Sequence, residues 1–343
     1  MPGGRLVLHV GAMKSGTTYL QSLLYANRPA LGDRGIFLPG KTWRRQARAV
    51  YGLLNSEGTA WQGMARRISA HEGTSVVSME FLAAATPEQA RELRESVSTD
   101  LEVVITARDL NRSIPAMWQE TVQNGRTWTW QEYLDGIVAH RPWHRDADRE
   151  VPETGAHFWR QQNIVRMART WCDVVGPERV SIVTVPHPGA RRELLWERFA
   201  SVVGTDPAGM QPAAAANESI GLASAMALRE LNELLEQRGV AFPRSSVVRK
   251  RVLAKQVLAA RRGSEPSLGL PVEDWVVEHA EQTVGRLRAL GVRLVGDWAE
   301  LDPVAVEGVH TRDVSDREVA DAALAGLAGL VDTASGDPSA LRR

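Results

Sequence analysis

The chain has little cysteine and no net charge. Its 343 residues include one cysteine, Cys172, so no disulfide forms within a single chain, and a reducing compartment is expected. Its 41 basic residues balance 41 acidic ones. This neutrality gives no support to nucleic-acid binding, which normally brings a basic excess or stripe.

Long apolar runs are also missing. No stretch is long enough to span a bilayer, and the beginning of the chain lacks the basic-then-apolar pattern of a signal peptide. We therefore expect a cytoplasmic protein without an integral membrane segment. The high content of alanine, arginine and tryptophan favours a bacterial source, and the oligomeric state stays open.

One segment, LVLHVGAMKSGTTYLQ over residues 6–21, carries the strongest signal. It predicts a short buried strand, then a turn bounded by Gly11 and Gly16, then a helix with Leu20 and Leu24 on one face. Such a turn directs several backbone N–H groups and the positive end of a helix dipole at one spot. The segment therefore predicts an anion-binding site.

The turn differs from an ATP-binding P-loop in the position of its lysine. Gly11 and Gly16 keep the four-residue gap of that motif, but Thr17 stands where a lysine is required. The lysine, Lys14, lies inside the loop instead. We infer a phosphate-binding loop with displaced positive charge, which argues against ordinary ATP chemistry.

Apolar runs alternate with amphipathic stretches along the chain, which predicts an α/β fold with a central parallel sheet and helices on both faces. The predicted strands are residues 6–10, 75–78, 102–106 and 180–185, with a last apolar stretch at 292–295. The predicted helices are residues 17–24, 87–96, 113–123, 191–203, 219–238, 247–262, 272–290 and 315–331.

Ligands in such sheets bind beyond the carboxyl ends of the strands. The segments that follow the first four strands should therefore meet at one site. They are Gly11–Thr18, Met79–Glu80, Ala107–Arg108 and Pro186–His187.

We expect one domain over residues 1–303 and a helix with a disordered tail over 304–343. Within the domain, residues 124–158 carry Trp128, Trp130 and Trp143 and are expected to pass over an acceptor site, which these tryptophans would line. Residues 206–290 are expected to form a helical extension.

Residues Val10–Gln21 resemble the phosphosulfate loop of sulfotransferases that use 3′-phosphoadenosine 5′-phosphosulfate (PAPS), with Met13 in place of the usual proline. Residues 103–119 resemble that family's second phosphate element, and Arg108 matches the arginine with which the family holds the 3′-phosphate. The family's serine position holds Ala116, and Ser113 lies one helical turn earlier. The resemblance reaches to about Pro303 and implies the three-layer fold of P-loop nucleotide-binding proteins.

The resemblance implies a role for each matching residue. Lys14 would contact the oxygen that bridges phosphate and sulfonate, and Arg108 with Ser113 would hold the 3′-phosphate. Glu80 would be the base that takes the acceptor's proton, and no metal is required. The loop residues that would hold the 5′-phosphate are Ser15, Gly16, Thr17 and Thr18.

Each role has a structural alternative. Arg108 is also a candidate ion-pair partner of Asp109, Ser113 a candidate helix N-cap, and Glu80 a carboxylate at a helix start. His157 is a rival base.

Other polar residues have weaker functional readings. His9 in the first strand is expected to be a satisfied core residue. His140 and His144 are one helical turn apart, a spacing that is a weak signal of a metal site. The late basic groups 249–251 and 261–262 are read as solvated helix faces or as contacts of the 3′-phosphate.

These features together predict a sulfotransferase that moves the sulfonate of PAPS to a hydroxyl, or an amine, of a small-molecule, carbohydrate or lipid acceptor. Adenosine 3′,5′-bisphosphate would be the product nucleotide. The alternatives are a non-catalytic nucleotide-binding protein and a P-loop kinase with a displaced lysine. The sequence does not identify the acceptor.

Overall fold

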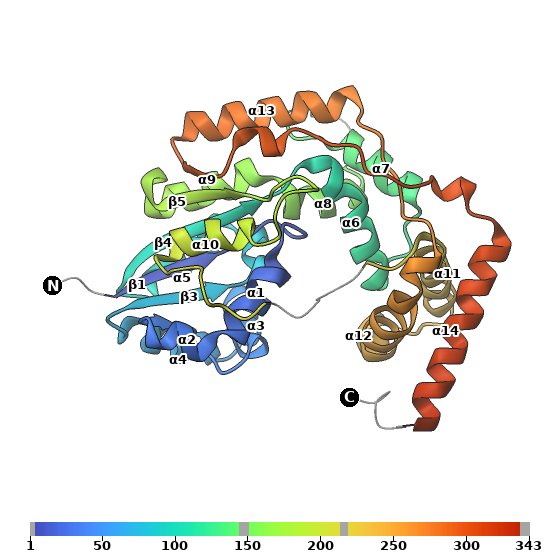
Figure 1. The fold of residues 1–343 in the computed structure, drawn as a ribbon, viewed down its shortest axis with the longest axis horizontal. Coiled ribbons are helices and arrows are strands. Elements are labelled where there is room, and N and C mark those ends of the chain that lie inside the picture. Colours follow the sequence, from blue (N-terminus) through green and yellow to red (C-terminus); the bar gives the residue numbers. More distant parts are fainter. Residues whose placement is uncertain (1–3, 144–150, 213–218, 337–343) are drawn as a thin grey trace. The chain divides into compact units, whose positions relative to one another are not determined.

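The computed structural model describes residues 4–143, 151–212 and 219–336. The chain divides into two compact units, each drawn from three stretches of sequence (Figure 1). The first comprises Met1–Leu110, Arg160–Ala216 and Glu273–Pro303, and the second Asn111–Trp159, Asn217–Val272 and Val304–Arg343. This division differs from the expected single domain over residues 1–303.

The first unit contains a six-stranded parallel sheet in the order β2-β3-β1-β4-β5-β6. Each predicted strand is present, with its ends shifted by two residues or fewer, and the pattern missed only the two residues of β2. The strands are β1 (Arg5–His9), β2 (Ile36–Phe37), β3 (Thr74–Ser78), β4 (Asp100–Ala107), β5 (Val180–Thr184) and β6 (Arg293–Val295).

The helices of the first unit surround this sheet. The short 3-10 helices are η1 (Glu80–Ala84), η2 (Pro177–Arg179) and η5 (Trp298–Leu301). The α-helices are α1 (Thr17–Ala26), α2 (Arg28–Asp33), α3 (Trp43–Leu54), α4 (Ala60–Ser69), α5 (Pro87–Glu95), α9 (Ile164–Val175), α10 (Leu194–Val203) and α13 (Asp274–Leu290).

Both faces of the sheet are covered. On one face, Val7 and Val104 of the sheet pack with Leu20 of α1 and Phe199 of α10 in a single buried cluster. On the other face, α9 packs against β4, β5 and α5. Two covered faces explain why the strands are continuous apolar runs rather than alternating ones. The predicted three-layer α/β fold class is confirmed.

The strand order reverses at β1. The strands β2 and β3 lie on one side of β1, and the chain then crosses to β4 on its other side. Such a reversal leaves a crevice at the carboxyl ends of the strands, where ligands bind. His9, the last residue of β1, pairs with Ser78 of β3 and Val104 of β4, so β4 continues past the end of β1. The backbone N–H of Ala12 donates to Thr106 O at 2.9 Å, and this bond ties the loop to that overhang.

The second unit is helical. Its helices are α6 (Leu110–Gln123), α7 (Trp130–Ala139), α8 (Glu153–Gln162), α11 (Leu222–Gln237), α12 (Phe242–Ser246), the π-helix η3 (Val247–Leu258), the 3-10 helices η4 (Ala259–Ser264) and η6 (Thr311–Asp313), and α14 (Asp316–Gly336). Helix α14 packs against α11 and η3. The C-terminal segment therefore belongs with residues that were expected in the domain over 1–303. Most of the expected disordered tail, residues 337–343, lies outside the described residues.

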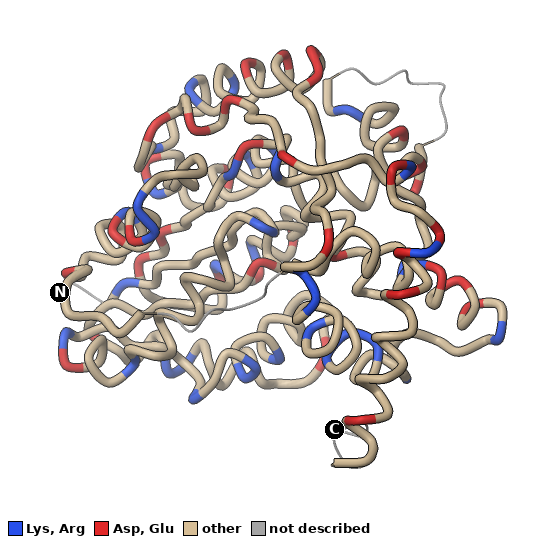
Figure 2. Tube along the Cα trace, turned by 45° about the vertical axis from the view of Figure 1, so that its right-hand side comes forward, with Lys and Arg blue, Asp and Glu red and all other residues tan. Residues whose placement is uncertain are grey.

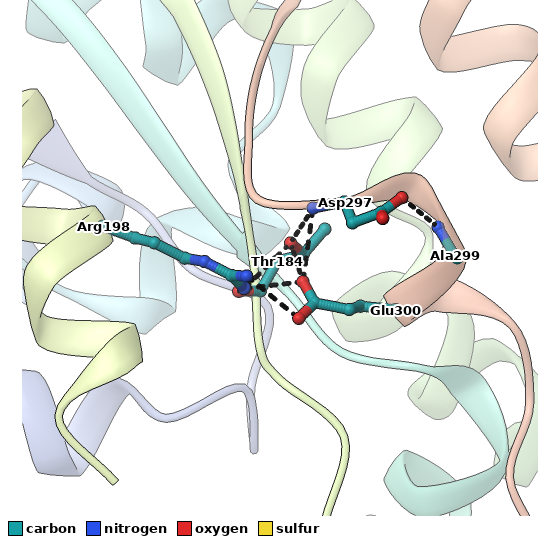
Figure 3. Close-up of polar contacts among 5 residues, drawn as sticks. All are labelled: Thr184, Arg198, Asp297, Ala299 and Glu300. Atoms are coloured by element: carbon teal, nitrogen blue, oxygen red, sulfur yellow. Dashed lines mark hydrogen bonds and ion pairs between the residues drawn. The ribbon is translucent and has the colours of Figure 1, made fainter. Parts of the chain in front are cut away.

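A polar cluster fixes the segment after β6 to the sheet of the first unit (Figure 3). The Arg198 guanidinium donates two hydrogen bonds to the Glu300 carboxylate, at 2.6 and 3.0 Å. Thr184 Oγ1, at the end of β5, donates to the same carboxylate at 2.5 Å. Gly296 has φ +123°, and a Cβ there would lie 1.9 Å from Thr184 Oγ1. Only glycine therefore lets the chain pass this close.

The charge state of Glu300 depends on these partners. Burial disfavours the ionised carboxylate, but the hydrogen bonds from Arg198 and Thr184 and the charge of Arg198 outweigh it and lower the pKa of Glu300. Both side chains of the Arg198–Glu300 pair are only about 15% exposed, at 15% and 16%. Removing one partner therefore leaves a poorly solvated charge.

We expect Glu300→Gln to destabilise the protein by about 2 kcal/mol at pH 7, because Arg198 loses its charged partner. A carboxylate with a lowered pKa contributes stability that is present above its unfolded-state pKa, 4.5, and is lost as the pH falls below it. The difference between variant and wild type should therefore shrink below pH 4.5. Urea unfolding from pH 3.5 to 7 measures it, with Glu92→Gln, at an exposed position of α5, as control, and a pH-independent difference would contradict the assignment.

Candidate functional site

The loop between β1 and α1 is held in an uncommon backbone conformation. Gly11 and Gly16 have φ values of +44° and +82°, and Lys14, which is not a glycine, has φ +62°. A left-handed conformation costs a non-glycine residue about 1 kcal/mol or more. Neighbouring side chains of the first unit therefore have to stabilise it.

Two side chains hold the loop carbonyls. Arg108, just after β4, donates from Nη1 to the backbone oxygen of Lys14 at 3.2 Å. Gln162 donates to the backbone oxygen of Met13 at 2.8 Å. Both bonds act on the turn that contains the left-handed residue, so they define its conformation before any ligand binds.

Gly16 is required by space as well as by its φ. A Cβ at this position would lie 2.4 Å from Leu195 Cδ2 of α10, well inside van der Waals contact. The first hydrogen bond of α1 runs from Leu20 N–H to Gly16 O at 3.1 Å. The N–H groups of Thr17, Thr18 and Tyr19 precede that bond and lie at the positive end of the helix, which is an anion-binding arrangement.

A chain of buried hydrogen bonds runs beneath the loop. Ser78 Oγ and His9 Nδ1 are 2.8 Å apart, and His9 Nε2 is 3.1 Å from Thr106 Oγ1. Thr106 Oγ1 is 2.7 Å from Ser15 Oγ, which donates to the Ala12 carbonyl. The chain connects β3, β1, β4 and the loop. The Ser15 hydroxyl is therefore turned inward.

His9 is neutral at physiological pH. Its side chain is 1% exposed, and burial lowers the pKa of His9 to about 3. A neutral imidazole has one donor and one acceptor nitrogen, which matches a position between two hydroxyl groups. The expectation of a satisfied core histidine is confirmed.

Glu80 lies at the same edge of the sheet and is held by α1. Gln21 Nε2 donates to Glu80 Oε2 at 2.7 Å and to the Ser78 carbonyl at 3.2 Å. Glu80 is also the first residue of η1, as its structural alternative expected. Gln21 was missed in the sequence, although it lies on the same helix one turn after Thr17.

Arg108 also lines a small cavity of about 30 Å³ with Gln162, His279 and Thr283. This volume holds about one water molecule, so the cavity is not a nucleotide site. The fourth expected segment, Pro186–His187, follows a residue that is bonded to the end of β4: Val185 N–H donates to Ala107 O at 2.8 Å. Its His187 is 3.2 Å from the backbone oxygen of Asp302.

Two candidate residues belong to the second unit. Ser113 is 1% exposed inside α6, which begins at Leu110, so its assignment as an N-cap is wrong. His157 lies on α8 with its ring 5.4 Å from that of Trp128, in an edge-on contact. Trp130 is 2% exposed and packs 5.7 Å from Trp118, so it is a core residue and does not line a pocket.

The late basic residues have partners within the second unit. Arg249 is 4% exposed and donates to Asn232 Oδ1 and Ser245 Oγ, which corrects its assignment to a solvated face. Lys250 binds Glu120 at 2.7 Å, and Arg261 binds Glu265 at 2.9 Å.

Within residues 4–143, 151–212 and 219–336, no three His, Cys, Asp or Glu side chains gather as a metal site. His144 of the weak metal pattern lies outside those ranges. In the same part of the chain, no helix is both long and apolar enough to cross a membrane.

No protein-family model matches the chain, and no curated protein matches it. A solved structure similar to it is a sulfotransferase from Alicyclobacillus acidocaldarius. The two sequences are 18% identical, the alignment covers 75% of this chain and 98% of the other, and the TM-score is 0.41. A similarity of 18% identity and this TM-score carries no argument for function.

We expect His9→Gln to flatten the pH dependence of stability. A buried histidine with a lowered pKa costs nothing above its unfolded-state pKa of 6.5. Below that pH the unfolded chain takes up the proton and the folded protein loses stability, by about 2 kcal/mol at pH 5.

Denaturant unfolding at pH 7.5, 6.5 and 5 measures this slope in wild type and in His9→Gln. The glutamine also breaks hydrogen bonds, so the diagnostic quantity is the slope rather than the stability at one pH. The control is His71→Gln, at a half-buried histidine 3.2 Å from the Gly35 backbone oxygen. Equal slopes in His9→Gln and wild type would show that His9 is not held neutral.

Proposed function

We propose that the first unit is the catalytic unit of a sulfotransferase that transfers the sulfonate of PAPS to a hydroxyl, or an amine, of a small-molecule, carbohydrate or lipid acceptor. The observation that carries the proposal is the position of Lys14. It lies inside the anion-binding turn, in a left-handed conformation, with its carbonyl bound by Arg108.

The loop suits a phosphate ester in its shape and charge. The N–H groups of Thr17, Thr18 and Tyr19 precede the first hydrogen bond of α1, so they can donate to an anion at this end of the helix. We assign the 5′-phosphate to Ser15, Gly16, Thr17 and Thr18. PAPS, when bound, supplies a sulfonate on a phosphate leaving group.

Lys14 and Glu80 have complementary roles in the proposed transfer. As the acceptor oxygen bonds to sulfur, the bond from sulfur to the bridging oxygen breaks and that oxygen gains negative charge. A fixed ammonium at Lys14 stabilises this charge more in the transition state than in the ground state. Glu80 takes the proton of the acceptor hydroxyl. Gln21 holds one Glu80 oxygen, Oε2, so Oε1 is the oxygen assigned to the proton.

We assign the 3′-phosphate to Arg108 of the first unit. A guanidinium binds phosphate oxygens in pairs, which favours arginine over lysine at such a position. Its bond to the Lys14 carbonyl would couple recognition of the 3′-phosphate to the shape of the loop.

We expect adenosine 3′,5′-bisphosphate to bind without added metal and AMP to bind far more weakly. Arg108→Ala should weaken the bisphosphate by about 100-fold, the loss of a charge-assisted pair, and leave AMP within a few-fold. Calorimetric titration measures both ligands. Arg179→Ala is the matched control, because Arg179 pairs with Asp100 at the amino end of β4.

Two results would reject this assignment. Equal weakening of both nucleotides by Arg108→Ala would limit the arginine to holding the loop. Binding that requires magnesium and ATP, lost in Lys14→Ala, would support the kinase instead.

We expect Glu80→Gln to lower kcat by about 100-fold or more, as loss of a general base does, while nucleotide affinity stays unchanged. The assay follows transfer from radiolabelled PAPS to a panel of hydroxyl acceptors. Glu88→Gln, on the exposed start of α5, is the control. Unchanged turnover in Glu80→Gln would exclude it as the base and leave His157 as the candidate. No transfer by wild type to any acceptor, with tight bisphosphate binding, would favour the non-catalytic alternative.

A further inference from the structure

A second pocket of the first unit lies between α3 and α4, outside the residues of the loop. Its volume is about 750 Å³, within the range of small-ligand sites. It is lined by Gly40, by one face of α3 and by residues 57–67, which lead into and form most of α4.

The pocket lies in the most basic stretch of the first unit. Residues 41–70 contain six basic residues and one acidic residue, Glu57, in a chain whose total charge is zero. Figure 2 shows blue positions recurring along the helices at the lower left. The balance of the whole chain therefore hides a local excess of positive charge.

Three arginines line the pocket from two sides. Arg45 and Arg48 are three residues apart on α3, so they share one helix face, and Arg67 comes from α4. The Arg67 guanidinium lies 5.2 Å from the centre of the Phe37 ring, which restricts its orientation.

These arginines have no acidic partner. In the described part of the chain, no carboxylate lies within 4.0 Å of Arg45, Arg48 or Arg67, and Glu57 at the pocket wall makes no ion pair with them. Another exposed arginine of the unit, Arg191, does pair, with Glu197 at 2.9 Å. The cluster thus has positive charge that no carboxylate of the described chain balances.

The remaining wall is apolar and open. Ala49 and Met64 are buried at 1% and 8% exposure and form its apolar part, and Tyr51, 55% exposed, stands at its edge. Gly63 faces it with no side chain, and a Cβ there would have only Arg66 Nη2 near it, at 4.0 Å. The pocket therefore offers a cavity as well as charge.

We propose that the α3–α4 pocket binds a small polyanion that carries two or more sulfate, phosphate or carboxylate groups. Guanidinium groups bind such oxyanions through paired hydrogen bonds. The three guanidiniums lie around one cavity and are exposed, so a ligand with several negative groups can bind more than one of them. The limited volume selects a compact ligand.

The pocket is connected to the catalytic edge through α3. Gln46, next to Arg45, donates to Val76 O at 3.2 Å and accepts from Ser78 N–H at 3.2 Å. Glu80 follows two residues after Ser78. A ligand on the first turn of α3 therefore lies on the helix that contacts the end of β3, although the binding proposal does not depend on the catalytic one.

The test uses three probes: sucrose octasulfate, inositol hexakisphosphate and citrate, with sucrose as the neutral control. Wild-type protein should bind at least one of them by calorimetric titration at physiological salt, and the rank of the three identifies the preferred group. Arg45→Ala/Arg67→Ala should weaken the best probe by about tenfold or more. Sucrose should not bind.

Two other arginines of the first unit give a matched control. Arg44 on α3 and Arg169 on α9 are exposed and do not line the pocket, so Arg44→Ala/Arg169→Ala removes the same charge. That variant should retain affinity within about twofold, the loss due to long-range charge alone. Lys14→Ala should also bind normally, because its site is the loop.

A further variant tests the cavity without changing charge. Gly63→Leu fills the pocket and improves helix propensity, so it should fold and should weaken the best probe by about tenfold. Thermal melts confirm folding of each variant. Equal losses in the two double arginine variants, normal binding by Gly63→Leu, or no binding of any probe by wild type would each overturn the proposal.

Discussion

The candidate site depends on the hydrogen bonds that His9 makes in the interior of the sheet. They join the ends of β3, β1 and β4 to Ser15, and through Ser15 to the turn itself. A protonated imidazole in this place would carry two donors and a buried charge, and the alternation of donor and acceptor would fail. Burial keeps the ring neutral, so the same packing that excludes water also gives the loop its support.

The loop is held in its shape in advance of any ligand. Lys14 takes a conformation that its side chain disfavours, and Arg108 and Gln162 maintain it from outside the turn. Binding of an anion there would therefore not require the free-energy cost of ordering the loop. This arrangement explains why one short segment depends on residues from β4, α8 and α10.

The fold class and the loop were predictable because both are local in sequence. Buried parallel strands are short apolar runs, and the turn is bounded by glycines whose φ values only glycine adopts readily. Strand β2 was missed because two residues carry no periodicity. Helix α6 begins three residues before the predicted start, at Leu110, because Asp109 and Leu110 gave no apolar repeat.

Contacts between distant segments were beyond the sequence pattern. Gln162 on Met13 and Leu195 beside Gly16 are separated by more than 140 residues from their partners, and no spacing rule connects them. The sequence indicates a surface cation at Arg249, yet the side chain is buried and hydrogen-bonded to Asn232 and Ser245. The α3–α4 pocket arises because two amphipathic helices face each other, which their separate patterns do not state.

The interleaving of the two units has a consequence for synthesis on the ribosome. Domains generally fold as units while the chain emerges from its N-terminus. Here the sheet around the loop receives its edge strand, β6, and the Glu300 partner of Arg198 only from the stretch Glu273–Pro303. The loop, made long before that stretch, therefore waits for it before its supporting unit is complete. A ribosome stalled at residue 272 would present a nascent chain with an open sheet edge.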